Sequence, residues 1–131
     1  MKRRMLLLAF SGFMIMAGKA QFANTQWKGE MGIPQGEGQP LEATEAVWDF
    51  KPDTVIVHFP GGGQDEVMTY RVTGDILTLI KVSGSSECDP GSSGKYRYRI
   101  QGDQFFIKVS EDSCAGRSAI DFSKPFERVK D

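Results

Sequence analysis

The fold of this chain is decided by residues 70–82, Tyr70-Arg71-Val72-Thr73-Gly74-Asp75-Ile76-Leu77-Thr78-Leu79-Ile80-Lys81-Val82. Apolar and polar residues alternate on both sides of a Gly-Asp pair. This pattern is typical of two antiparallel strands joined by a two-residue turn with glycine first. It recurs in residues 96–109, around Gly102-Asp103. The sequence therefore predicts two successive β-hairpins with type II′ turns.

Turns of this length also predict the strand register. The predicted pairs are Tyr70 with Leu79, Val72 with Leu77, Tyr96 with Val109, Tyr98 with Ile107, and Ile100 with Phe105. All of these side chains then share one inner face, because side chains alternate between the two faces of a strand. A slip of one residue would turn every one of them outward, so the agreement between the two hairpins supports the register.

The rest of the chain also alternates with a period of two. Residues 26–33, 44–50 and 54–59 are predicted strands, and a last short strand lies near residues 126–129. With the two hairpins this makes eight strands, a pattern typical of a β-sandwich or an up-and-down barrel. One short helix is predicted before the last strand, within residues 111–119, with Ser110 as its N-cap and Gly116 at its end.

The first 20 residues have the composition of a secretory signal peptide. Lys2-Arg3-Arg4 precedes an apolar run from Met5 to Ala17, and small residues stand at positions 18 and 20. The run is shorter than the ~20 apolar residues that a membrane-spanning helix needs. We therefore expect a signal peptide over residues 1–20, one domain over residues 21–131, and a secreted or periplasmic protein without stable membrane insertion.

Charge and cysteine content restrict the function classes. Residues 1–20 hold four of the 16 Lys and Arg, so residues 21–131 keep 12 against 17 Asp and Glu, a net charge of about −5. This balance argues against a nucleic-acid partner. Cys88 and Cys114 are an even pair in an exported chain and predict one disulfide. Such a loop would stabilise the fold by roughly 3 kcal/mol.

Several motifs together resemble those of small bacterial members of the lipocalin-like superfamily. Trp27 in Thr25-Gln26-Trp27-Lys28-Gly29 stands where the family has its first-strand tryptophan, and residues 50–55 look like the turn between the second and third strands. Cys88 and residues 112–117, Asp112-Ser113-Cys114-Ala115-Gly116-Arg117, resemble the segments that a disulfide joins in such proteins. The resemblance covers roughly residues 25–130. It implies an all-β fold, an eight-stranded antiparallel up-and-down barrel, with either Arg128 or Arg117 packed over the tryptophan.

The resemblance also implies that a small, mostly apolar ligand is carried or sensed. A barrel of eight strands either packs its interior or holds one small ligand. We expect inward-facing side chains to form that site: Trp48, Tyr70, Leu79, Tyr98, Phe105 and Ile107. Buried tyrosine hydroxyls need partners, so the interior is either internally hydrogen-bonded or able to accept a polar group. The alternative is a packed barrel that binds a protein partner, for example as an inhibitor.

The sequence contains no motif that indicates catalysis or metal binding. His58 is the sole histidine, and no nucleophile motif such as G-x-S-x-G accompanies it. Four zinc ligands are hard to assemble from one histidine and two cysteines. We therefore expect no enzymatic activity, no metal and no cofactor. The sequence does not indicate an oligomeric state.

Overall fold

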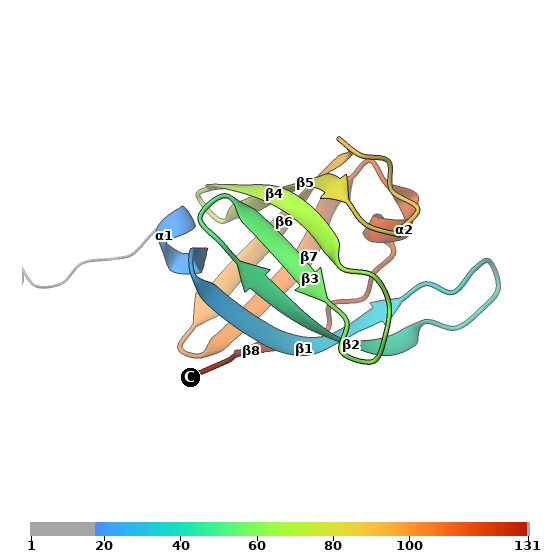
Figure 1. Cartoon of the computed structure of the whole chain (residues 1–131), viewed down its shortest axis with the longest axis horizontal. Helices are drawn as coiled ribbons and strands as arrows, with labels where there is room; N and C mark the ends of the chain where they lie inside the picture. The colour runs from blue at the N-terminus through green and yellow to red at the C-terminus, as the bar shows by residue number, and fades with distance from the viewer. Residues whose placement is uncertain (1–17, 131) are drawn as a thin grey trace, which may run out of the picture.

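The computed structural model describes residues 18–130, which form a closed barrel of eight antiparallel strands in up-and-down order (Figure 1). The strands are β1 (Thr25–Ile33), β2 (Glu42–Phe50), β3 (Thr54–His58), β4 (Glu66–Thr73), β5 (Ile76–Ser83), β6 (Ser93–Gln101), β7 (Gln104–Asp112) and β8 (Phe126–Arg128). Helix α1 (Lys19–Phe22) precedes β1, and helix α2 (Ala115–Ser118) lies between β7 and β8. The predicted fold class is confirmed, and the barrel rather than the sandwich is the correct architecture.

Both predicted hairpin turns are confirmed. Gly74 and Gly102 have φ angles of 60° and 62°, whereas the aspartate that follows each glycine stays outside the positive-φ region. A positive φ at the first central residue alone defines the type II′ turn, and glycine adopts it without steric cost. All five predicted pairs of the inner face occur in the β4–β5 and β6–β7 ladders.

The barrel closes through β8, the shortest strand. Arg128 pairs with Trp27 of β1, and Phe126 pairs with Phe105 of β7. The guanidinium carbon of Arg128 lies 5.4 Å from the centroid of the Trp27 indole, within the range of a cation–π contact. Of the two arginines that the sequence left open for this position, Arg128 is the one that lies over the tryptophan.

The two ends of the barrel are built differently. One end, here called the closed end, carries α1 and the tight turns at residues 51–53, 74–75 and 102–103 (Figure 1). The opposite end, here called the open end, carries α2 and the longer connections at residues 34–41, 59–65 and 84–92 (Figure 1). Longer loops cover a barrel end less regularly than tight turns, so the open end is the natural place for a site.

Aromatic side chains fill the closed end. Phe22 of α1 is fully buried and lies 4.7 Å from Phe50, 5.0 Å from Tyr98 and 5.4 Å from Phe105, measured between ring centroids. Tilted and edge-to-face contacts at these distances add to the stabilisation from apolar burial. Phe22 therefore closes this end of the barrel as a plug.

The hydroxyls of all three tyrosines are bonded within the protein. Tyr70 donates to the backbone oxygen of Lys51 at 2.7 Å, and Tyr98 donates to the backbone oxygen of Gly74 at 3.1 Å. Tyr96 donates to the carboxylate of Asp112. Of the two alternatives that the sequence allowed for these hydroxyls, the structure has the internally hydrogen-bonded one.

The predicted boundaries before β8 need one correction. Ser110 does not cap a helix, because the β6–β7 register shifts between Lys95 and Tyr96 and β7 continues through Asp112. A bulge of this kind adds one residue to a strand, and here that extra residue is Ser110. The N-cap is Cys114, and Gly116 lies inside α2 rather than at its end.

The N-terminal prediction is only partly within the described residues. Residues 1–17 lie outside them, so most of the predicted signal peptide is not described. Helix α1, which was not predicted, spans the predicted cleavage point between Ala20 and Gln21. Cleavage there would leave Phe22 in the mature chain.

Candidate functional site

A cavity of about 700 Å³ occupies the open end of the barrel. Its lower wall consists of inward side chains of the strands: Met31, Trp48, Val57, Met68, Leu79 and Tyr96. Its upper wall comes from the loops at residues 34–37 and 85–88 and from the segment at residues 115–122, which includes α2. The β strands bring their apolar side chains here because each lies at an inward position of an alternating run.

One buried ion pair stands behind the cavity wall. Arg117 of α2 lines the cavity, and its Nε and Nη2 donate to the two carboxylate oxygens of Asp112 at 2.5 and 2.9 Å. The backbone N–H of Cys114 also donates to Asp112, at 2.8 Å. Bidentate geometry and a further donor make Asp112 a well-satisfied buried carboxylate.

The surroundings of Asp112 shift the pKa values of three groups. Burial alone would raise the pKa of Asp112, but hydrogen bonds from Arg117, Tyr96 and Cys114 outweigh it and hold the pKa below its usual value. Burial raises the pKa of Tyr96, and its hydrogen bond to Asp112 adds to the shift. Burial lowers the pKa of Arg117, but its hydrogen bond and charge interaction with Asp112, together with its interactions with Tyr96, outweigh burial and raise the pKa. Asp112 and Arg117 are therefore both charged at neutral pH and balance each other.

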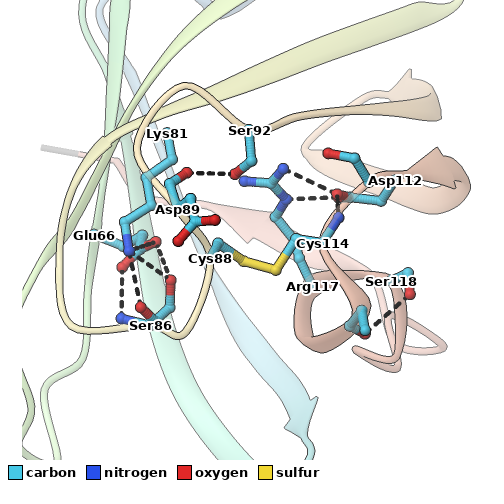
Figure 2. The surroundings of a disulfide bond; sticks show 12 residues. Glu66, Lys81, Ser86, Cys88, Asp89, Ser92, Asp112, Cys114, Arg117 and Ser118 are labelled. Carbon is cyan, nitrogen blue, oxygen red and sulfur yellow. Dashed lines mark hydrogen bonds and ion pairs between the residues drawn. A yellow bond between two sulfur atoms is a disulfide. The ribbon is translucent and has the colours of Figure 1, made fainter.

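The disulfide and a second polar network fix the rim loop at residues 84–92 (Figure 2). Cys88 in this loop is bonded to Cys114 at the start of α2, with 5.5 Å between the Cα atoms. Lys81 is buried and donates to the backbone oxygen and the hydroxyl of Ser86 at 2.9 and 3.0 Å. The Ser86 hydroxyl in turn donates to Glu66 at 2.6 Å. The predicted disulfide is confirmed, and it is compatible with an oxidising compartment.

Carboxylates dominate the charged part of the cavity wall. Glu66 is 3.5 Å from the ammonium of Lys81 and is thereby balanced. Glu37, Glu42 and Glu87 also line the cavity, and within the described residues none of them forms an ion pair. The mouth of the cavity therefore carries net negative charge.

The six residues predicted for the ligand site divide between the two ends. Trp48 and Leu79 line the cavity. Tyr70, Tyr98, Phe105 and Ile107 point inward as expected, but they belong to the packed core below the cavity and do not line it. The sequence pattern finds the inner face correctly, but period-two alternation carries no information about which end of the barrel stays open.

Several residues that line the cavity are not among the six predicted site residues. Met31 and Val57 share the inward parity of their predicted strands, so the alternation itself was a usable signal for them. Arg117, Ile120 and Phe122 lie in the irregular segment between β7 and β8. That segment has no periodicity, and only tertiary packing brings these three side chains to the cavity.

The sole histidine of the chain, His58, does not line the cavity. His58 faces outward on β3, with its Nδ1 3.0 Å from Asp65 and its Nε2 3.7 Å from Asp49. Within residues 18–130 no group of His, Cys, Asp and Glu is arranged to hold a metal ion. In the same part of the chain, no helix has the length and apolar character needed to cross a membrane.

Comparison with known families, curated proteins and solved structures finds no match to this chain. The barrel geometry is compatible with a lipocalin-like fold.

Proposed function

We propose that this protein is an exported, lipocalin-like binding protein that holds a small, mostly apolar molecule in the open-end cavity. The observation that carries the proposal is a cavity of about 700 Å³ in a barrel whose other end is densely packed. Pockets of ~300–1,000 Å³ are the usual size for small-molecule sites. The mechanism is non-covalent: burial of apolar surface against Met31, Val57, Met68 and Leu79 drives binding.

Two further features support the lipocalin-like assignment. The first is the contact between Arg128 and Trp27 where the last strand meets the first, because the resemblance implies an arginine packed over this tryptophan. The second is the disulfide between the rim loop and the segment after β7. The disulfide and the predicted signal peptide together favour a secreted or periplasmic location.

A second candidate function is that of a protein-interaction or inhibitor module without a small ligand. Two exposed apolar side chains near the open end favour it: Leu41 is 45% exposed and Val82 is 49% exposed. A partner that docked on this end would cover both residues and the mouth of the cavity. Isolated exposed apolar residues are common on protein surfaces, however, so the cavity is the stronger observation.

Native mass spectrometry of the oxidised protein, purified from its own host, tests the binding function. We expect a captured molecule of a few hundred daltons, a size suited to the cavity. Ile120→Trp places a larger side chain in the cavity and should reduce the fraction of the protein that carries this added mass. Ile100→Trp is the matched control, since Ile100 is equally half-buried but does not line the cavity.

A bare mass for the wild-type protein would contradict the binding function and favour the interaction module. If both tryptophan variants kept the added mass, the molecule would bind elsewhere and the cavity would not be the binding site. Capture by the wild type and by Ile100→Trp, with loss in Ile120→Trp, supports the proposal.

A further inference from the structure

Two side chains that line the cavity each carry a buried N–H donor without an acceptor. These donors are Nε1 of Trp48 and Nη1 of Arg117, which have no hydrogen-bond partner within residues 18–130. Trp48 is 2% exposed and Arg117 is 7% exposed, and both side chains line the cavity. Buried donors are almost always paired, so an unpaired one calls for an explanation. Two in the wall of one cavity are explained together if the cavity's occupant supplies an acceptor.

The other indole of the chain, that of Trp27, has a hydrogen-bond partner. Trp27 is also fully buried, and its Nε1 donates to the hydroxyl of Thr25 at 2.8 Å. The buried indole that does not line the cavity therefore has a hydrogen-bond acceptor within the protein. Trp48 instead lies in the cavity wall. It packs against aromatic rings such as those of Phe122 and Phe126, and phenyl rings carry no oxygen acceptor.

The charge balance of the wall indicates which kind of acceptor fits. The charge of Arg117 is already balanced by Asp112, and that of Glu66 by Lys81. Glu37, Glu42 and Glu87 then leave the mouth negative, which opposes the entry of a carboxylate or phosphate. An uncharged oxygen meets the two donors without this repulsion.

Building on the proposed function, we propose that the occupant is an uncharged, mostly apolar molecule with a carbonyl or hydroxyl oxygen that accepts a hydrogen bond from Trp48 Nε1 or Arg117 Nη1. The same charge pattern makes the site select against carboxylates. Both nitrogens are covered by protein atoms in this conformation, so the oxygen reaches them as side chains of the wall give way. Met31 and Met68 in that wall are suited to this, because an unbranched thioether side chain repacks readily.

Four probes with the same phenyl ring and similar four-carbon chains separate the possibilities: butylbenzene, butyrophenone, phenylbutanoate and phenylbutylamine. They differ in charge and in the presence of an oxygen acceptor. Binding to the oxidised protein is measured by titration under one set of buffer and salt conditions. We expect butyrophenone to bind about tenfold tighter than butylbenzene, the effect of one net hydrogen bond, and phenylbutanoate to bind weakest.

The indole signals report directly on the proposed bond. The chain has two tryptophans, so a spectrum of the ¹⁵N-labelled protein contains two indole N–H resonances, and Trp48→Phe assigns them. Butyrophenone should shift the Trp48 resonance further than butylbenzene does if Trp48 is the donor. The Trp27 resonance, already bonded to Thr25, serves as the internal control.

Two variants test the donors. Trp48→Phe removes Nε1 and keeps an aromatic ring, while Arg117→Lys removes Nη1 and keeps a positive charge beside Asp112. At least one of them should erase most of the preference for butyrophenone over butylbenzene. Tyr98→Phe is the control, because the Tyr98 hydroxyl is bonded to Gly74 at the closed end and its loss should leave the preference unchanged.

The outcomes distinguish the two proposals. If no probe binds, the small-molecule function fails and this inference fails with it. If butylbenzene or phenylbutanoate binds as tightly as butyrophenone, the binding function stands and the acceptor assignment is wrong. Tightest binding by phenylbutylamine would likewise overturn it, since the acidic mouth would then set the preference. A preference for butyrophenone that survives in both donor variants also contradicts the assignment.

Discussion

Arg117 and Asp112 form a bidentate buried ion pair, with Nε 2.5 Å from Oδ2 and Nη2 2.9 Å from Oδ1. The pair joins α2 to the end of β7, directly behind the wall of the open-end cavity. The side chain of Asp112 is fully covered and that of Arg117 is 7% exposed. The contact holds α2, which forms part of the cavity wall, against the end of β7.

Asp112→Asn should lower the free energy of unfolding by about 3 kcal/mol, because it leaves the guanidinium of Arg117 buried without a counter-charge. Denaturant unfolding of the oxidised protein measures the change. Asp75→Asn is the control, since its ion pair with Arg97 is exposed on both sides and is worth about 0–1 kcal/mol. Equal losses in the two variants would show that the buried pair has no special role.

The contribution of Asp112 should also depend on pH. Its folded-state pKa is held below the ordinary value of 3.8, so the unfolded chain takes up the proton first as the pH falls. The stabilisation is therefore fully present above about pH 5 and is lost as the pH falls below 4 through the folded pKa. The difference in unfolding free energy between wild type and Asp112→Asn should shrink over that interval. A difference that stayed constant down to pH 2 would contradict this reading of the pair.

Replacing both disulfide cysteines, Cys88→Ser with Cys114→Ser, should cost about 3 kcal/mol, because a loop closed over a separation of 26 residues is freed in the unfolded chain. The loss should appear as a lower urea midpoint. Limited proteolysis should then cut first within residues 84–92, the rim loop that the disulfide fixes. Unchanged midpoints and an uncut loop would mean that Lys81 and Ser86 hold the loop by themselves.

Phe22→Ala should destabilise the protein by about 3–5 kcal/mol, since it removes the aromatic plug of the closed end and leaves a cavity. Phe106→Ala is the matched control. Phe106 faces outward on β7, under Arg99, so its loss should cost about 1 kcal/mol. Thermal and denaturant unfolding of both variants make the comparison. A small effect at Phe22 would show that α1 is dispensable for the barrel.

Gly94→Ala should destabilise the barrel by about 1–3 kcal/mol, as overpacking does. A Cβ atom at this position would collide with the carboxylate of Asp112 on the neighbouring strand. Gly61→Ala is the control, since a Cβ there meets nothing within 4 Å. If Gly94→Ala proved as harmless as Gly61→Ala, the carboxylate of Asp112 would have room to move, and the tight packing inferred around it would be wrong.

Local patterns account for what the sequence predicted well. The turns at Gly74-Asp75 and Gly102-Asp103 constrain the register of their hairpins by geometry that involves only neighbouring residues. The inward positions of Tyr70, Phe105 and Ile107 follow from the same alternation. By contrast, the prediction that Ser110 caps a helix is wrong, because Ser110 is the extra residue of a bulge within β7, and a bulge leaves no periodic signal.

The sequence by itself determined an all-β chain, two hairpin registers, the inner face of the barrel and one disulfide, since each depends on local spacing or on residue type alone. Tertiary structure alone decided the rest. It chose Arg128 as the partner of Trp27, placed Phe22 as the plug of one end, and left the cavity at the other. It also brought Arg117 against Asp112 behind the cavity wall. These features depend on packing between segments far apart in the chain, and the free energy of such contacts is not encoded in any short stretch of sequence.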